Sequence, residues 1–445
     1  MRNGISRKLT GLLCSIIILA AANSVLLWQI VSLSNIIKAA ITAGCGIFTL
    51  LFIIIGSGMK SESRKLKRLS SGSFILGCGI FMSIAEIAVI IFAIGKNGWL
   101  RNLIGILTAE LVITIVCLGG IVRIAASARQ FKVLRIIALF CLWYVPVINI
   151  FVFASFYRSA RHEYFFEEAK AELDTARKEN EICKTRYPII LVHGIFFRDW
   201  QLVNYWGRIP AELIRNGANI YYGGQQSAAK IEASASELAA RIKLVLDETG
   251  AEKVNIIAHS KGGLDSRYAI SQLGMDKYVA TLTTINTPHG GCDMVDFLLG
   301  KVSEKWQDKI SRKYNGIFGK LGDSAPDFMA GVRDLSAIRM KELNEQMPDS
   351  PDVSYRSVMS VMKCAVSAGF PLCISYLLIK KLNGANDGLV WAESAKHGQF
   401  RLIDNKGIRG ISHGDVIDLM RENIEGYDVR EFYTGLVAEL KTQGF

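Results

Sequence analysis

A serine near the middle of the chain has the surroundings of a nucleophile. It lies in the run Ala258-His259-Ser260-Lys261-Gly262, which follows a short apolar segment and opens a segment that favours helix. Nucleophilic serines occupy such a strand-to-helix turn in the pattern G-x-S-x-G, where small residues permit the tight turn; here alanine takes the first position. The positive end of the helix dipole also favours negative charge at this place. The run therefore predicts Ser260 as a nucleophile, with an ordinary helix-capping serine as the structural alternative.

A nucleophilic serine needs a base, and the base needs an acid that orients it. The chain has only six histidines. In a fold of this kind the order along the chain is serine, then acid, then histidine. Asp387, in an Asn-Asp-Gly turn, and His413, in a Ser-His-Gly turn, follow Ser260 in that order. We therefore predict Asp387 as the acid and His413 as the base, with Asp404 as the rival acid and His397 as the rival base.

An oxyanion formed at the attacked carbonyl needs hydrogen-bond donors, and backbone N–H groups supply them in this kind of site. The segment Leu191-Val-His193-Gly194-Ile195 follows the first predicted strand. Its glycine lets the chain turn so that the N–H of Ile195 faces the serine. The N–H of Lys261, directly after the nucleophile, is the second predicted donor. Each such donor contributes roughly 100- to 1,000-fold to the rate.

The elements that must hold these residues alternate between short β-rich runs and helical segments, a pattern typical of a mostly parallel sheet. The predicted strands are 187–192, 218–222, 254–258, 279–286, 353–361 and 398–403. The predicted helices include 201–216, 233–249, 261–273, 415–423 and 428–441. We therefore expect residues 187–445 to form one α/β domain.

Residues 187–445 resemble the bacterial triacylglycerol lipases of the α/β-hydrolase fold. The matching stretches follow the family order and read YPIILVHG, VNIIAHSKGGLDSRYAI, INTPHGG, DLSAIRMKELNEQMPD, GANDGLVWAESAKHG and ISHGD. Alanine in the first position of the serine turn resembles the Bacillus members. The resemblance implies a triad and two oxyanion donors, namely Ser260, Asp387, His413, Ile195 and Lys261.

The same resemblance suggests a calcium site, in which Asp415 matches one carboxylate ligand. Leu419 occupies a position that should carry an oxygen ligand, and the other ligands have no match. We expect the reaction itself to need no cofactor, and calcium stays open as an alternative.

The N-terminal part has a different composition. Residues 1–160 hold 16 Lys and Arg against three acids, whereas the remainder holds 36 against 37. The basic excess thus belongs to an apolar segment and not to a soluble fold, which argues against nucleic-acid binding. Five apolar runs reach the roughly 20 residues that a membrane span needs: 10–33, 36–58, 71–95, 102–126 and 133–157. We predict a transmembrane helical domain of about five spans over residues 1–157.

Basic residues predict the orientation of these spans, because cytoplasmic loops carry more Lys and Arg. One side holds the N-terminus and the loops near 60–68 and 123–135, and the other side holds only Lys38, Lys96 and Arg101. The N-terminus is therefore predicted to be cytoplasmic and the α/β domain extracytoplasmic. Residues 1–22 could instead be a cleaved signal peptide, but the apolar run continues past them and the α/β domain stays outside either way.

Two acids lie inside the predicted spans, at Glu86 and Glu110. In an antiparallel hairpin they reach nearly the same depth, where ionisable groups are costly and are candidates for function. A facing pair would share a proton; alternatively, each is protonated and hydrogen-bonds a neighbouring helix. The segment 158–186 that follows the spans is rich in Ala, Glu and Lys and lacks Gly and Pro, so we predict a helical linker.

These features predict a membrane-anchored serine hydrolase that cleaves carboxylic esters of lipids through an acyl-enzyme. Phe196, Phe197 and Trp200 beside the oxyanion turn would supply an apolar wall for acyl chains, or they simply pack the core. Residues 292–330 could form a mobile cap. The alternatives are an acyltransferase or thioesterase on the same triad, and a membrane transport or sensing protein whose outer domain binds lipid. The oligomeric state is left open.

Overall fold

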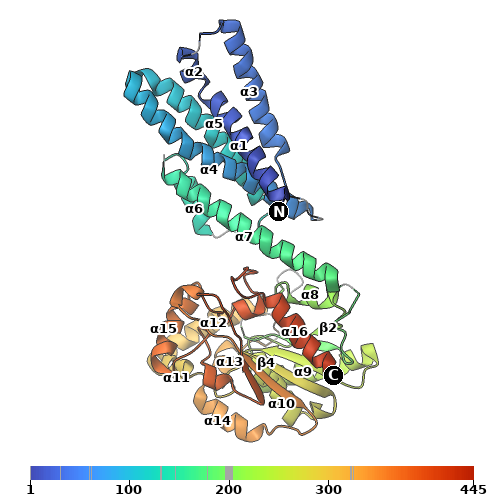
Figure 1. Ribbon diagram of the computed structural model, residues 1–445. Coiled ribbons are helices and arrows are strands. Elements are labelled where there is room, and N and C mark those ends of the chain that lie inside the picture. The colour runs from blue at the N-terminus through green and yellow to red at the C-terminus, as the bar shows by residue number, and fades with distance from the viewer. Residues whose placement is uncertain are drawn as a thin grey trace. The chain divides into compact units, whose positions relative to one another are not determined.

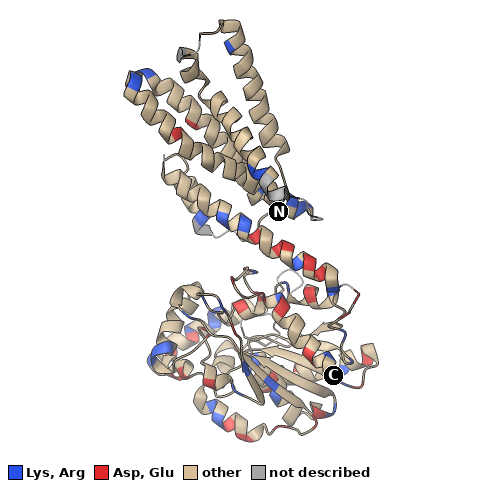
Figure 2. Ribbon diagram, viewed as in Figure 1, with Lys and Arg blue, Asp and Glu red and all other residues tan. Residues whose placement is uncertain are grey.

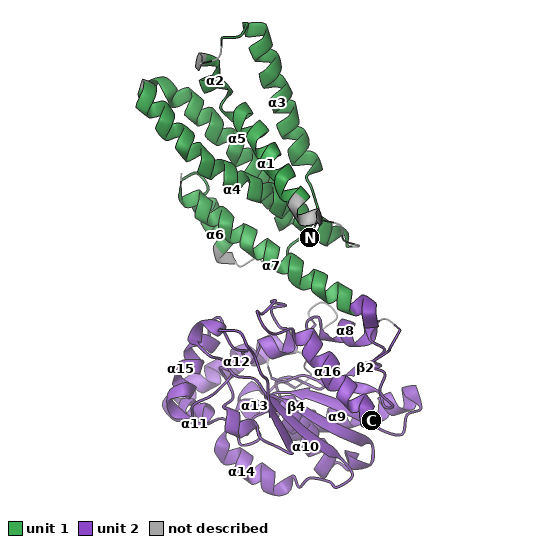
Figure 3. Ribbon diagram, viewed as in Figure 1, with its two compact units in different colours: residues 1–173 green, residues 174–445 purple. Residues whose placement is uncertain are grey.

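The computed structural model describes residues 2–30, 32–59, 61, 63–130, 133–145, 147–177, 179–195, 204–320, 323 and 325–445. The chain divides into two compact units, unit 1 (Met1–Leu173) and unit 2 (Asp174–Phe445), coloured separately in Figure 3. The boundary falls within the segment predicted as a linker.

Unit 1 is built from apolar helices (Figure 1). They are α1 (Arg2–Ala22), α2 (Ser24–Ile30), α3 (Asn35–Ile55), α4 (Arg64–Asn97), α5 (Trp99–Ala125), α6 (Val133–Leu142) and the beginning of α7 (Ile148–Arg177). Acidic residues are sparse in α1 to α6, as Figure 2 shows. Small residues let α4 and α5 pack closely: a Cβ on Gly120 would lie 2.8 Å from the backbone nitrogen of Leu76.

Three of these helices are long and apolar enough to cross a membrane within the described residues: Asn35–Ile55, Arg64–Lys96 and Trp99–Ala125. They coincide with the predicted second, third and fourth spans. The other two predicted spans are interrupted helices. The run 10–33 is divided at Asn23, whose side-chain amide bonds the carbonyl of Leu19, and the run 133–157 is divided between α6 and α7, where Val147 has a φ of 67°.

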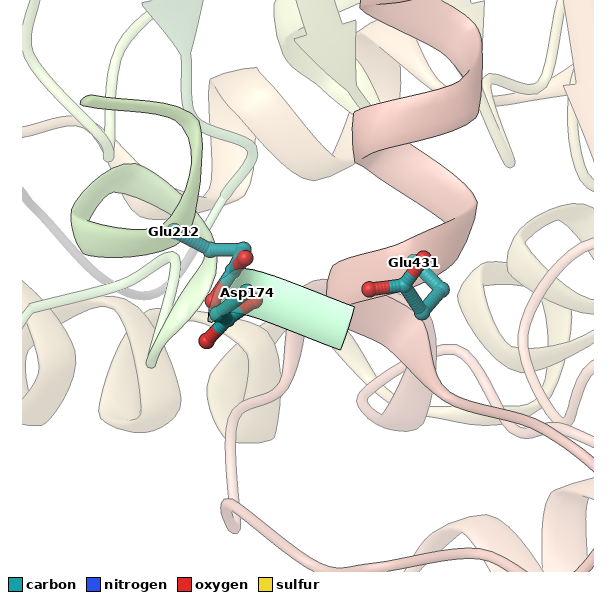
Figure 4. Close-up of side chains that lie close together, drawn as sticks. All are labelled: Asp174, Glu212 and Glu431. Atoms are coloured by element: carbon teal, nitrogen blue, oxygen red, sulfur yellow. The ribbon is translucent and has the colours of Figure 1, made fainter. Parts of the chain in front are cut away.

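The predicted helical linker is helical up to Arg177, as the last part of α7. Three carboxylates meet where α7 ends, those of Asp174, Glu212 and Glu431 (Figure 4). Two arginines neutralise them. Arg215 lies 2.7 Å from Asp174 and 2.9 Å from Glu212, and Arg177 lies 2.6 Å from Glu431. This cluster is an ion-pair network within unit 2.

Unit 2 is built on a six-stranded sheet in the order β2-β1-β3-β4-β5-β6, in which every neighbouring pair is parallel. The strands are β1 (Ile189–Val192), β2 (Ile220–Tyr222), β3 (Val254–His259), β4 (Val279–Ile285), β5 (Ser354–Met359) and β6 (Gln399–Leu402). All six predicted strands are confirmed. The buried apolar runs of β1, β3 and β4 are central strands of a sheet covered on both faces, whereas β2 and β6 are its less buried edges.

Helices cover both faces of the sheet. On one face, α8 (Ile209–Arg215) and α16 (Val429–Thr442) pack against Ile189, Leu191 and Ile257. On the other face, α9 (Ile231–Thr249) and α10 (Lys261–Gln272) pack against Ile190 and Ile256. Alternate residues of one strand thus point to opposite layers, and the ends of β1, β3 and β4 meet at one edge of the sheet.

The predicted helix 415–423 is wrong. Only a short 3₁₀ turn forms there, η4 (Asp415–Ile417), because Asp418 and Arg421 have φ values of 58° and 53°, which end a right-handed helix. The predicted helix 201–216 begins later, as α8, and its first three residues lie outside the described part.

In the described part of the chain five α-helices lie between the later strands, and three of them were predicted only as a cap over 292–330. They are α11 (Asp293–Lys301), α12 (Glu304–Lys320) and α13 (Phe328–Asp334), followed by α14 (Ala337–Gln346) and α15 (Leu372–Leu382). Figure 1 shows α11, α12 and α15 grouped on one side of unit 2.

Candidate active site

Ser260 stands at the turn between β3 and α10, with φ 54° and ψ −130°. A serine with positive φ is strained, and such strain persists only where the surroundings fix it. Its N–H donates to Ile285 at 2.9 Å, and its carbonyl accepts from the Thr287 hydroxyl at 2.8 Å. The side chain is therefore held on a rigid turn between two strand ends, as the sequence predicted.

The glycines around the serine are required by close packing. A Cβ on Gly262 would lie 2.3 Å from the carbonyl oxygen of His193, and one on Gly263 would lie 2.3 Å from the Thr287 hydroxyl. Both distances are far below van der Waals contact, so the start of α10 approaches the ends of β1 and β4 as closely as the backbone allows.

Asp387 is fully buried and its carboxylate is saturated with donors. One oxygen accepts the N–H groups of Leu389 and Val390 at 2.8 and 2.7 Å. The other accepts the Asn286 amide and bonds Nδ1 of His413, both at 2.6 Å. Four bonds fix the carboxylate in position, and three of them come from groups that can only donate.

His413 is nearly buried and is held to the same turn twice, since its backbone N–H also donates to the Asp387 carbonyl at 2.9 Å. Its ring centroid lies 4.5 Å from that of His259, the residue before Ser260. Because Asp387 occupies Nδ1, Nε2 is the ring nitrogen left to exchange a proton with another group. The structure thus places Asp387 and His413 together, beside the serine turn.

The two rivals are placed elsewhere. Asp404 is exposed. His397 bonds Asp349 through Nε2 at 3.0 Å and stacks on His289, whose centroid lies 4.5 Å away. Neither rival joins the pair formed by Asp387 and His413.

The predicted oxyanion turn lies directly against Ser260. A Cβ on Gly194 would lie 2.8 Å from the Cβ of Ser260, so only glycine fits there. The N–H of Gly194 donates to the Tyr205 hydroxyl at 3.1 Å, and that hydroxyl lies 2.6 Å from Nδ1 of His259. Burial lowers the pKa of His259 well below its usual value, so this imidazole stays neutral and can accept a hydrogen bond from the tyrosine hydroxyl.

Tyr205 therefore holds the turn through a chain of two hydrogen bonds. We predict that Tyr205→Phe lowers kcat by about 5- to 150-fold with little change in KM, since an unmade buried hydrogen bond costs ~1–3 kcal/mol. Steady-state ester hydrolysis measures both constants. Tyr433→Phe is the matched control, because Tyr433 is equally buried and its hydroxyl has no partner in the described residues. Equal kcat in both variants would contradict this role.

Lys261 extends a buried side chain away from the serine. Its ammonium lies 2.7 Å from Asp265 and 3.0 Å from the Ser234 hydroxyl, which ties α10 to α9. Burial raises the pKa of Asp265 to about 7, although Lys261 opposes the shift. The backbone N–H of Lys261 opens α10, where the first N–H groups of a helix have no acceptor within the helix.

The structure does not suit Asp415 as a calcium ligand. Both of its oxygens lie 2.8 Å from Nη2 of Arg409, and one also accepts the Ser412 N–H at 3.0 Å. Arg409 also bonds Glu422 at 2.6 Å. A guanidinium therefore occupies the place beside this carboxylate where a cation would sit, and Leu419 adds no oxygen.

We accordingly predict that EGTA leaves both ester hydrolysis and the thermal unfolding midpoint of the protein unchanged. Arg409→Met would instead lower the midpoint, because it leaves Asp415 buried without its partner, a loss of ~3–5 kcal/mol. Differential scanning fluorimetry with and without added Ca²⁺ measures both effects. A midpoint that rises with Ca²⁺ in the unmodified protein would contradict this reading.

Sequence reasoning missed two residues of the site. Asn286 follows β4 with φ 49°, and its side-chain amide bridges Asp387 and Ser360. An asparagine directly after a buried strand was the sequence feature that could have indicated this residue. Tyr205 carried no signal, because its role depends on the folded path of two distant segments. The predicted apolar wall of Phe196, Phe197 and Trp200 lies outside the described residues.

Comparisons with known proteins point to the same region. Residues 186–326 match the family model described as "Putative serine esterase (DUF676)". The triacylglycerol lipase of Pseudarthrobacter phenanthrenivorans is 35% identical over 178 residues, which cover 37% of this chain and 55% of the relative. That of Burkholderia plantarii is also 35% identical over 178 residues, covering 37% and 49%. This chain thus spans about half the length of these relatives.

Among solved structures, the mature form of the Bacillus licheniformis lipase BlEst2 is similar, with 22% identity, coverage of 56% of this chain and 91% of that chain, and a TM-score of 0.43. The sequence matches confirm the resemblance that the motifs predicted. The C-terminal part of the chain matches a serine esterase family and has triacylglycerol lipases as homologues, whereas the apolar N-terminal helices lie outside that match.

Proposed function

We propose that the protein is a membrane-anchored serine hydrolase that cleaves carboxylic esters of lipids. The observation that carries this proposal is the buried pair of Asp387 and His413 beside the strained turn of Ser260. An imidazole whose Nδ1 is fixed by a carboxylate is the orienting half of a serine hydrolase triad.

In the proposed reaction the Ser260 hydroxyl oxygen attacks the ester carbonyl while Nε2 of His413 takes its proton. The same nitrogen then gives the proton to the leaving alcohol, and an acyl group stays on Ser260. Water, deprotonated by His413, releases the acid and restores the serine. Asp387 keeps Nδ1 protonated and stabilises the imidazolium at each step.

The N–H groups of Ile195 and Lys261 are the proposed donors to the oxyanion. Within the described residues no acceptor bonds the N–H of Ile195, and Lys261 opens α10. The side chain of Ile195 packs against Phe318 of α12 and Phe328 of α13, so the cap helices hold this turn in place.

The proposed substrate class rests on the apolar surface of the cap helices and of α15, and on the lipases among the relatives. Large apolar side chains stand exposed on α11, α12 and α15, among them Phe297, Trp306, Ile374 and Leu377. On α15, Leu372 contacts Gly388 beside the catalytic acid, where a Cβ on the glycine would lie 3.2 Å from Leu372. An apolar cap next to the acid and the oxyanion turn favours esters with acyl chains over polar esters.

For unit 1 we propose five spans, with the interrupted helices α1–α2 and α6–α7 as the first and last. The backbone hydrogen bond from Leu27 to Asn23 continues across the first interruption, so α1 and α2 remain stacked. With the basic loops in the cytoplasm, unit 2 is then extracytoplasmic.

The test is hydrolysis of p-nitrophenyl esters of short and long acyl chains by membranes that carry the full-length protein, with Ser260→Ala as the blank. Long-chain hydrolysis that the variant lacks supports a lipase, and short-chain hydrolysis alone points to an esterase with a shallow pocket. Analysis of the products in the presence of alcohols or thiols separates hydrolysis from acyl transfer. Equal inactivity of both proteins on all esters would contradict the proposal.

A further inference from the structure

A polar pair lies in the interior of the unit 1 helices. The side-chain amide of Asn23, at the junction of α1 and α2, donates to Oε2 of Glu86 on α4 at 2.6 Å. Asn23 is 5% exposed and Glu86 is 0% exposed. The pair therefore faces the interior of the helices and not the lipid.

Each member of the pair has an oxygen without a donor. The Asn23 amide uses its two N–H groups on Glu86 and on the carbonyl of Leu19. Its Oδ1 and the Oε1 of Glu86 are buried and have no partner in the described residues. Buried acceptors of this kind are rare and require an explanation, and here two belong to groups that are already bonded to each other.

Within the described residues no Lys or Arg side chain bonds these oxygens. The carboxyl group of Glu110 on α5 acts on Glu86 electrostatically with the same sign of charge. α2 has no ionisable residue, and Lys38 of α3 donates to its Trp28 carbonyl at 2.9 Å. The nearest cationic residue of α1, Lys8, precedes Asn23 by about four turns, and Lys96 of α4 follows Glu86 by about three. Ala22 directly precedes Asn23, and Met82 lies one helical turn before Glu86; both are apolar residues of the unit 1 core.

We propose that Asn23 and Glu86 form a binding site for one small monovalent cation, either a proton or Na⁺. A single positive charge between the two oxygens satisfies both acceptors and neutralises Glu86 in an apolar interior, where an isolated charge is costly. Oxygen ligands of an amide and a carboxylate suit a hard cation, and they equally suit an O–H on Glu86 that donates to the Asn23 amide. This site is independent of the hydrolytic site in unit 2.

The two cations are separated by two measurements on the full-length protein in detergent micelles. Equilibrium binding of ²²Na⁺ reports sodium, and the infrared C=O band of a protonated carboxyl, followed between about pH 5 and pH 9, reports the proton. We expect Glu86→Gln to abolish the signal and Asn23→Ala to weaken cation affinity about tenfold or more.

Glu163→Gln is the matched control. Glu163 is a buried carboxylate of unit 1 whose two oxygens both accept backbone N–H groups, from Arg129 and Gln130. Far-UV circular dichroism and the thermal unfolding of the same preparations report whether each variant is folded. Two results support the site. One is saturable Na⁺ binding, and the other is a pH-dependent carboxyl band without Na⁺ binding. In either case the signal is lost in Glu86→Gln and kept in Glu163→Gln. Absence of both signals from the unmodified protein overturns it, and so does a folded Glu86→Gln variant that keeps the signal.

Discussion

Replacing Ser260 by alanine lowers kcat/KM for ester hydrolysis by about 10⁴-fold or more. The remaining rate exceeds that of the uncatalysed reaction only by the enhancement that the oxyanion donors supply. The effect is large because the substitution removes the atom proposed to form the acyl-enzyme, while the turn itself remains. The Ser260 backbone bonds to Ile285 and Thr287 do not involve the hydroxyl.

The control for this variant is Ser266→Ala, on the same helix. Ser266 is fully buried and its hydroxyl donates to the Gly262 carbonyl at 2.7 Å. Its loss costs about 1 kcal/mol of stability and leaves kcat/KM within a few-fold. The double variant Ser260→Ala with His413→Ala is expected to be no slower than Ser260→Ala alone, because residues of a triad act as a unit. A further large loss in the double variant would contradict a shared role.

Replacing Asp387 by asparagine lowers kcat by about 10³- to 10⁴-fold, with KM little changed. The asparagine side chain cannot satisfy all four donors that surround the carboxylate, because one of its two terminal atoms becomes a donor itself. If the amide nitrogen faced His413, it would donate to Nδ1 and force the imidazole proton onto Nε2. Nε2 is the nitrogen that must accept the serine proton in the proposed reaction. The buried site would also lose the charge that stabilises the imidazolium.

Asp404→Asn is the matched control, since this exposed acid is the rival in sequence and makes the same change of charge. It is expected to retain full activity. Measurement of kcat and KM for both variants on one long-chain ester decides between the two acids. A large loss in Asp404→Asn, with activity kept in Asp387→Asn, would reverse the assignment of the acid.

Much of unit 2 could be predicted from the sequence, because local signals coincide with the fold. The central strands β1, β3 and β4 are buried apolar runs, and small residues at fixed spacing mark the Ser260 turn. The Asn-Asp-Gly and Ser-His-Gly turns showed where an acid and a histidine could stand. Their hydrogen bond depends on the path of α15 between β5 and β6, which no local pattern determines.

The remaining features depend on contacts between distant segments. Arg409 neutralises Asp415 across a loop, so the carboxylate that matches a calcium ligand serves an ion pair. The interruption at Asn23 lies inside an apolar run that hydropathy alone treats as one span. Asn23 contacts Glu86, 63 residues away. Glu86 was singled out by its depth alone. Of the two predicted alternatives, the structure shows the hydrogen bond to a neighbouring helix, and the partner is an asparagine of the first apolar run.

The most direct test is to treat the full-length protein with a fluorophosphonate, which phosphonylates only an activated serine, and to locate the adduct by peptide mass spectrometry. We predict a single adduct on Ser260, formed in parallel with the loss of ester hydrolysis and absent from His413→Ala. Complete loss of hydrolysis with the adduct on another serine, or undiminished hydrolysis after Ser260 is fully modified, would contradict the assignment of Ser260 as the nucleophile.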